Sequence, residues 1–174
     1  MTRAELFEKL RPIIELITGY DGAVIPADPN APAPSGAYCS VEPMQSVRTI
    51  GQIVVDANGQ NRDVDTEVRS QKVATVSINF YRGDAQSAAN TLDRCNFRPD
   101  VSMALFRENI GWLGMGPVQN LNSLVSGNVE SRAQTTVQIS YQHVQQSTVN
   151  AIESVGLEVQ NEDGETIYEY DIIS

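Results

Sequence analysis

Two stretches in which apolar and polar residues alternate constrain the fold of this chain more than any other feature. The first covers residues 70–82 and sets Ala74, Val76, Ile78 and Phe80 against Val73, Thr75, Ser77 and Asn79. The second covers residues 131–145 and sets Val137, Ile139, Tyr141 and His143 against Thr136, Gln138, Ser140 and Gln142. Because successive side chains of a strand point to opposite faces, each stretch predicts a strand with one apolar face and one mostly polar, uncharged face.

Helical spacing and terminal signals predict a helix over residues 2–18. Thr2 and Glu5 form a capping-box pattern ahead of an apolar stripe made of Leu6, Leu10, Ile13, Ile14 and Ile17. We expect Gly19 to end the helix, because glycine adopts the left-handed conformation without steric cost. We expect Pro12 to kink the helix or to start a new turn, because proline has no backbone N–H to donate.

Two shorter helices are predicted between the alternating strands. The Gly83-Asp84 pair favours a helix over residues 84–96, whose inward face would hold Ala85, Ala88, Ala89, Leu92 and Cys95. A second helix is predicted from Pro99 to about Asn109, ended by Gly111, with Val101, Ala104 and Leu105 inward. Residues 112–125 then predict an irregular strand broken by Gly114, Gly116 and Pro117.

The remaining segments predict connections and hairpins. Residues 26–36 carry four prolines and favour an extended surface strap that leads into a strand over residues 37–50. Residues 51–67 predict a projecting hairpin, because Asn58-Gly59 favours a tight turn. Residues 157–174 predict a C-terminal hairpin or tail, preceded by Val149, Ile152 and Val155 at helical spacing.

The order of these elements predicts an α+β fold. We expect a mostly antiparallel sheet with helices packed on one face. With 174 residues the chain has room for one core, so we expect a single domain over residues 1–174.

The charge balance argues against two classes of partner. The chain has 12 Lys and Arg residues against 22 Asp and Glu residues, a net charge of −10. Such acidity disfavours binding nucleic acid by its phosphates or binding an anionic membrane surface. The start Met-Thr-Arg-Ala-Glu-Leu does not resemble a signal peptide, and two cysteines make no disulfide framework. We therefore expect synthesis in a reducing cytoplasm.

The residues point to no catalytic, cofactor or metal site. His143 is the single histidine, and no nucleophile, cysteine or carboxylate lies beside it. Cys39 and Cys95 are expected to behave as small buried hydrophobic residues. The alternating carboxylates of residues 63–67 would share one strand face, but this segment lacks the glycine and spacing of a calcium loop. The glycines at 111, 114 and 116 do not form a dinucleotide fingerprint.

The segment from residue 70 to residue 144 carries a recognisable order of short patterns. The strand Val76-Ser77-Ile78-Asn79-Phe80 runs into the Gly83-Asp84 cap, Ile110-Gly111-Trp112 follows the paired helices, and Val118-Gln119-Asn120-Leu121 precedes the long polar-faced strand. This order resembles the neck or tail-terminator family of contractile-tailed bacteriophages. With the N-terminal helix, the resemblance covers most of residues 1–155.

The resemblance implies a non-enzymatic virion protein at the neck, the junction between head and tail. It implies a small α/β sandwich that closes into a hexameric ring on the last ring of the tail tube, stops tube polymerisation and joins the tail to the head. The expected partners are further copies of the chain, the tail tube protein and a head-side connector or stopper protein; anchoring of the sheath is left open. DNA would pass through the channel without specific binding, and the family implies no membrane, cofactor or catalytic residue.

Candidate interface residues come from the uncharged strand faces and from the two hairpins. A ring of identical chains needs surfaces that pack without burying charge, and free strand edges accept strands from a partner. The candidates are Val54, Asn58, Gly59, Arg62, Ser77, Asn79, Gln138, Tyr168 and Tyr170. If acidic side chains line the channel of such a ring, they would repel the passing DNA.

Three other functions stay open at this stage. Another head–tail connector, such as a stopper or completion protein, fits the same features. An enzyme of unrecognised type, for instance a hydrolase, would use Asp63 and Asp65. A small-ligand binding module is the third, although the sequence indicates no pocket for it.

Overall fold

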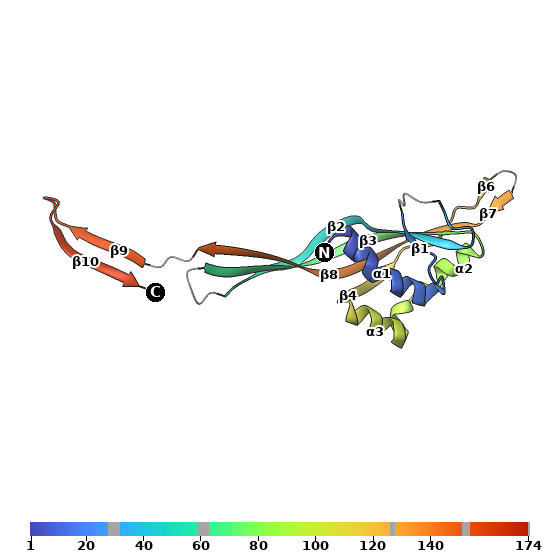
Figure 1. Cartoon of the computed structure of the whole chain (residues 1–174), viewed down its shortest axis with the longest axis horizontal. Helices are drawn as coiled ribbons and strands as arrows, with labels where there is room; N and C mark the ends of the chain where they lie inside the picture. Colours follow the sequence, from blue (N-terminus) through green and yellow to red (C-terminus); the bar gives the residue numbers. More distant parts are fainter. Residues whose placement is uncertain (28–31, 59–62, 126–127, 151–153, 174) are drawn as a thin grey trace. The chain divides into compact units, whose positions relative to one another are not determined.

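The computed structural model describes residues 1–27, 32–58, 63–125, 128–150 and 154–173 (Figure 1). The chain divides into two compact units. The first unit consists of Met1–Gln52 and Ser70–His143, and the second of Ile53–Arg69 and Val144–Ser174. This division concerns contacts within the chain and does not test independent folding. The single domain expected over residues 1–174 stays a prediction.

The structure is α+β with a mostly antiparallel sheet, as the sequence predicts. The helices are α1 (Arg3–Thr18), α2 (Ala85–Asn90), the 3₁₀ helix η1 (Cys95–Phe97) and α3 (Pro99–Arg107). The strands are β1 (Val24–Pro26), β2 (Tyr38–Asn58), β3 (Asp63–Tyr81), β4 (Ile110–Met115), β5 (Gln119–Asn120), β6 (Ser123–Val125), β7 (Asn128–Glu130), β8 (Arg132–Asn150), β9 (Ser154–Gln160) and β10 (Thr166–Ile173).

The main sheet has the strand order β1-β2-β3-β8-β4, and β5 also pairs with β8. The strands β1 and β2 pair in parallel, and Val24 lies opposite Cys39. The antiparallel pairing of β4 with β8 sets Ile110 opposite Tyr141 and shifts register between Trp112 and Gly114. The strands β9 and β10 form a separate antiparallel pair, which confirms the C-terminal hairpin.

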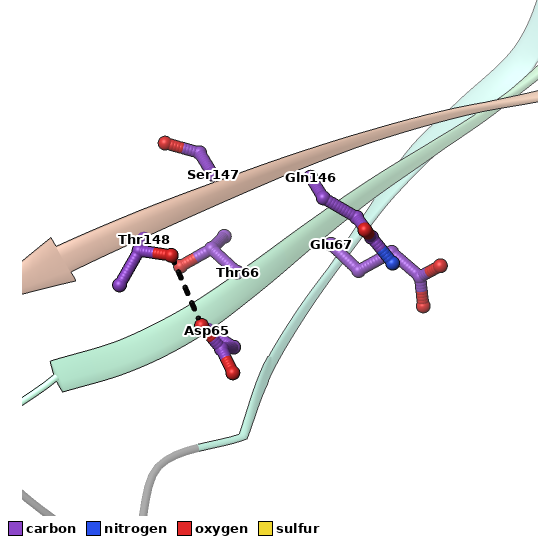
Figure 2. A pocket seen from close by; sticks show the side chains of 6 residues that line it. All are labelled: Asp65, Thr66, Glu67, Gln146, Ser147 and Thr148. Carbon is purple, nitrogen blue, oxygen red and sulfur yellow. Dashed lines mark hydrogen bonds between the residues drawn. The ribbon is translucent and has the colours of Figure 1, made fainter.

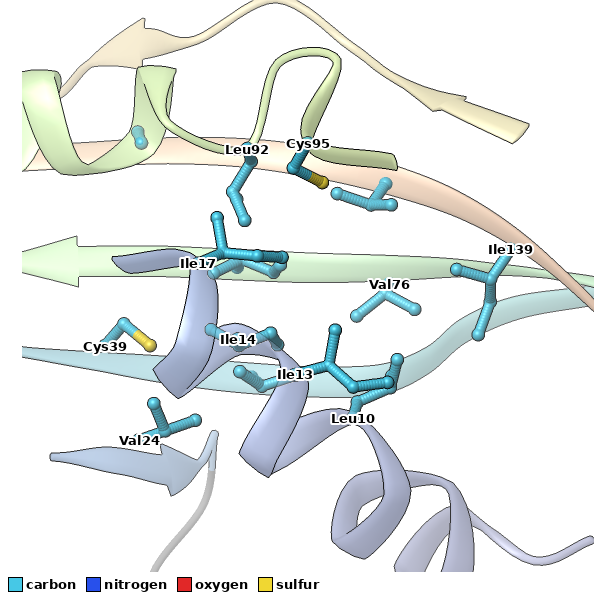
Figure 3. Packing of buried hydrophobic residues seen from close by; sticks show 14 of the residues in the cluster. Leu10, Ile13, Ile14, Ile17, Val24, Cys39, Val76, Leu92, Cys95 and Ile139 are labelled. Atoms are coloured by element: carbon cyan, nitrogen blue, oxygen red, sulfur yellow. The ribbon is translucent and has the colours of Figure 1, made fainter. Parts of the chain in front are cut away.

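The core of the first unit lies between the helices and one face of the main sheet (Figure 3). The apolar stripe of α1 is almost fully buried, and Leu10 and Ile14 each keep 1% of their surface exposed. Opposite them, β3 presents the four residues predicted to face inward, which are Ala74, Val76, Ile78 and Phe80. The strand β8 adds Val137 and Ile139. Burial of these side chains supplies the main force that holds helix and sheet together.

Both ends of α1 match the sequence signals. Thr2 and Glu5 form the capping box, with the Thr2 backbone N–H donating to Glu5 Oε2 at 2.8 Å. Gly19 ends the helix at φ 74° and donates its N–H to the Glu15 carbonyl. The helix runs through Pro12 from Arg3 to Thr18 without starting afresh, so the alternative of a new turn at that proline is wrong.

The helix predicted over residues 84–96 is shorter than expected. Asp84 caps it as predicted, but α2 ends at Asn90, and η1 begins only at Cys95. The Thr91 hydroxyl donates to the Ala88 carbonyl at 2.6 Å, and Arg94 adopts φ 54°, which no α-helical residue does. The break turns η1 back onto α3, and Leu92 and Cys95 still reach the core.

The boundaries of three other predicted elements change. The α3 helix ends before Asn109, which adopts φ 54°, and Gly111 lies inside β4 rather than ending the helix. The predicted strand over residues 37–50 and the first arm of the hairpin are one uninterrupted strand, β2. The helical pattern before the C-terminal hairpin is wrong, because β8 extends to Asn150 and Val155 lies in β9; Ile152 falls outside the described residues.

Arg82 holds the end of the proline-rich segment against the sheet. Its Nη1 donates to the Pro34 carbonyl, and its Nε donates to Glu130 at 3.1 Å. The guanidinium also lies 5.6 Å above the Tyr38 ring, and that ring stacks on Tyr81 with centroids 4.6 Å apart. The proline-rich segment has few large apolar residues with which to pack against the core. The hydrogen bonds, the ion pair and the ring contacts of Arg82 and Tyr38 hold its end in place instead.

The burial of α1 yields a stability prediction with a matched control in the same helix. Leu10 is 1% exposed and Leu16 is 43% exposed. Leu10→Ala should lower the free energy of unfolding by about 2–5 kcal/mol, because it leaves a cavity against the sheet. Leu16→Ala should change it by less than about 1 kcal/mol. Urea unfolding followed by circular dichroism measures both, and equal losses would contradict this account of the core.

Candidate interaction surfaces

The sheet face that points away from the helices in the first unit is polar and nearly free of charge. Ser77 lies on this face at 3% exposure, and its Oγ accepts a hydrogen bond from Gln134 Nε2 at 3.2 Å. Alternation along β3 and β8 places Asn79 and Gln138 on the same face, where Asn79 is half-buried and Gln138 is exposed. The structure therefore brings together three predicted interface residues from two neighbouring strands.

Two glycines beside this face lie close to hydroxyl side chains of β8. A Cβ at Gly111 would lie 2.4 Å from Ser140 Oγ, and one at Gly116 would lie 2.8 Å from Thr136 Oγ1. Both distances are shorter than side chains tolerate, so the two glycines let β4 and the turn after it lie close to the small polar side chains of β8. The faint glycine pattern of the sequence thus has a packing role.

An apolar run in β2 is exposed in the second unit. Ile53, Val54 and Val55 keep 59%, 51% and 59% of their surface exposed. Three consecutive apolar residues place apolar side chains on both faces of the strand. The strand order puts β2 beside β3, and the pairing described for β1 reaches only Cys39–Val41. An exposed apolar edge strand of this kind is a template for pairing with another chain.

A second exposed apolar surface lies on η1 and α3 in the first unit. Phe97, Met103 and Phe106 are 79%, 52% and 77% exposed, whereas Val101 and Leu105 of the same helix face the core. We call these three exposed residues the aromatic face. Sequence reasoning assigned the inward side of this helix and overlooked the outward one; the signal was the presence of large apolar residues on both sides of a short helix.

An open groove lies beside α1 in the same unit. Its volume is about 600 Å³. It is lined by Arg3, Ala4, Phe7, Glu8 and Arg11 of α1 and by Pro26, Val41 and Pro43 of β1 and β2. We call it the α1 groove. Its floor is apolar, and its rim carries charged side chains.

Two of the three predicted carboxylates, Asp65 and Glu67, line a polar pocket of about 460 Å³ in the second unit (Figure 2). Thr148 Oγ1 donates to Asp65 Oδ1 at 3.1 Å, and Arg69 Nε donates to Glu67 Oε2 at 3.0 Å. Asp63 belongs to β3, but its side chain lies outside the described residues. Among the residues that are described, no three His, Cys, Asp or Glu side chains gather as metal ligands would. The two described carboxylates therefore act as hydrogen-bond acceptors within the sheet.

The two units differ sharply in charge. The second unit contains 11 acidic and two basic residues, a net charge of −9. The first unit contains 11 acidic and ten basic residues, a net charge of −1. Nine of the ten net negative charges therefore belong to the 48 residues of the second unit, a division that the total charge of the chain does not reveal.

The remaining candidate residues occupy varied places. Val54 is exposed in β2, and Asn58 is the last residue of that strand. Tyr168 and Tyr170 lie in β10 opposite Val159 and Leu157, and their side chains lie outside the described part of the chain. Gly59 and Arg62 fall outside the described residues altogether. Their role at an interface stays a prediction.

The titratable groups singled out by the sequence are structural. Burial raises the pKa of the Cys39 thiol to about 12 and that of the Cys95 thiol to about 11. Both cysteines are buried, as predicted. The pKa of His143 is lowered by partial desolvation, by Lys72 and by the chain's N-terminal amine. The two buried thiols are therefore protonated and poor nucleophiles near neutral pH.

Comparison with known proteins places these surfaces in a biological setting. The family model described as phage neck terminator protein matches residues 4–165. The chain belongs to this family. It is therefore a structural protein of the phage neck, a virion component that contacts other head or tail proteins. No curated protein matches the sequence significantly. Among the described residues, no helix is long and apolar enough to cross a membrane.

The buried thiols yield a reactivity prediction. Because their pKa values lie well above 8, both should be protonated and shielded in the folded protein at that pH. We expect Ellman's reagent at pH 8 to modify neither thiol within minutes in buffer and to modify two per chain in urea. Cys39→Ser and Cys95→Ser identify the residue concerned if one thiol reacts. Rapid modification of the native protein would contradict the burial described here.

Proposed function

We propose that this neck terminator protein closes into a ring, most simply a hexamer, at the head-side end of the tail tube. The ring stops tube polymerisation and provides the surface to which the head-side connector attaches. The observation that carries the proposal, together with the family, is the exposed apolar run Ile53–Val55 on β2. In a monomer these three apolar side chains would stay exposed to water, whereas a strand added by a partner would cover them.

The predicted interface residues fit two kinds of contact in this proposal. Val54 and Asn58 belong to β2, Gly59 and Arg62 lie in the sequence between β2 and β3, and Tyr168 and Tyr170 belong to β10. We assign these residues to contacts in which β2 or β10 pairs with a strand of a partner. Ser77, Asn79 and Gln138 belong to the uncharged sheet face, which can pack on a neighbour without burying charge. The tube protein, the head-side connector and the sheath are the partners we assign to these surfaces.

The acidity of the second unit suits a protein that DNA must pass. If second units line the channel of the ring, their net charge of −9 each would repel the phosphates and keep DNA from adhering. The protein would then bind DNA nowhere along its passage. A ring whose channel wall proves neutral or basic would remove this part of the proposal.

The proposal predicts what Val54→Asp does to assembly. We expect the wild-type protein, mixed with purified tail tubes, to appear in negative-stain images as rings at one end of each tube. Val54→Asp should reduce ring-capped ends at least tenfold, because a carboxylate would have to be buried against the added strand. Val129→Asp is the matched control, since Val129 is 70% exposed in β7 of the first unit.

Two outcomes would contradict the proposal. A wild-type protein that stays monomeric and never binds tube ends would refute the ring. Rings that form equally well with Val54→Asp would refute the role of β2. Deletion of the gene from the phage distinguishes a terminator from a stopper. Overlong or unjoined tails indicate a terminator, whereas tails of normal length that fail to attach to heads indicate a stopper.

A further inference from the structure

We propose that the first unit joins neighbouring copies head to tail: the aromatic face of one copy fills the α1 groove of the next. This inference rests on the proposed ring and names the contact that would build it. Both surfaces belong to the first unit; the aromatic face is exposed, and the groove borders the core through Phe7 and Val41.

The aromatic face has the composition of a binding hot spot. Phe97 and Phe106 keep more than three quarters of their surface exposed, and Met103 keeps about half. Met103 and Phe106 are three residues apart and share the outward side of α3, while η1 packs against that helix and adds Phe97. Phenylalanine and methionine are enriched at interfaces, and exposed apolar side chains that cluster mark interaction sites. Covering them releases apolar area from water.

The α1 groove has the size and lining to receive such side chains. Its apolar lining consists of the exposed residues Ala4 and Pro26 and of Phe7, Val41 and Pro43, which are buried and form the floor. Its volume of about 600 Å³ exceeds the roughly 150 Å³ of a cavity that holds one benzene ring. The groove therefore has room for more than one aromatic or methionine side chain.

The two surfaces lie on different sides of α1, so one copy cannot fill its own groove. Lys9 Nζ binds Glu108 Oε2 at 2.6 Å and fixes α3 to one side of α1. Ala4, Glu8 and Arg11 share another side of the helix, which faces β1 and β2. Because the donor and acceptor surfaces differ, the contact is heterologous, and repeated rotation either closes a ring or builds a filament.

Charge pairs the two surfaces in one orientation. Glu8 stands on the rim of the groove, and Arg107 stands at the end of α3 beside Phe106; within the described part of the chain neither has an ion-pair partner. The other charged residues near them are already engaged, Arg11 with Glu15 at 3.2 Å and Arg98 with Asp100 at 2.7 Å. Joining Glu8 of one copy to Arg107 of the next would satisfy both charges beside a desolvated apolar contact.

A charge exchange tests the contact without disturbing the core, since both side chains lie on the surface of the first unit. Glu8→Arg and Arg107→Glu should each raise the protein concentration needed for ring formation at least tenfold, because like charges would then face each other. The double variant should restore assembly to within about threefold of wild type. Leu113→Arg is the control, as Leu113 is 55% exposed on β4 and belongs to neither surface.

Cross-linking gives a direct readout of the same contact. With Ala4→Cys and Phe106→Cys in one chain, a short bismaleimide should produce a ladder of covalent multimers, because each groove would hold a neighbour's α3. The native cysteines are buried and serve as an internal control in the parent chain. Analytical ultracentrifugation and circular dichroism of each variant confirm that it is folded.

The outcomes separate this inference from the proposed function. The wild-type protein could form rings, the single charge variants could form them equally well, and the cysteine variant could give no ladder. That result would overturn the contact between the aromatic face and the α1 groove and would leave the proposed ring intact. A wild-type protein that forms no ring at all would overturn the proposed function. Cross-links that appear only when tail tube protein is present, and join the chain to it, would show that the groove receives that protein instead of a second copy.

Discussion

The burial of α1 against one face of the main sheet is the contact on which the rest of the structure depends. Leu10, Ile13 and Ile14 meet the inward side chains of β3 and β8, and no other helix covers as much of that face. Because the helix covers only one side, the opposite face has to be satisfied by its own small polar side chains, as in the Gln134–Ser77 hydrogen bond. The same helix positions α3 through the Lys9–Glu108 pair.

Once α3 is held there, its helical period decides which side chains are buried. Val101 and Leu105 reach inward, whereas Met103 and Phe106 lie on the opposite side of the helix and stay exposed. The fold of a single copy thus leaves large apolar side chains in water at a defined place. Exposed surface of this kind in a structural virion protein is best explained by assembly, since association covers what folding leaves open.

The alternation of β3 and β8, the ends of α1 and the C-terminal hairpin were all predictable, because each depends on local rules of periodicity, capping and turns. The end of α2 was not, because Arg94 adopts a left-handed conformation that the apolar spacing of Leu92 and Cys95 does not reveal. The α1 groove could not be predicted either. Its walls come from segments that only the parallel pairing of β1 with β2 brings beside the helix.

The division of charge between the units limits how copies can be held together. Second units that each carry −9 repel one another wherever they come within a Debye length of about 8–10 Å. Contacts made by that unit must therefore rely on backbone pairing and uncharged side chains, such as those of Ile53 and Val54. The first unit, at −1, has no such penalty and can bring copies into close apolar contact. The second unit therefore carries most of the net negative charge, and the first unit carries apolar surfaces available for contact between copies.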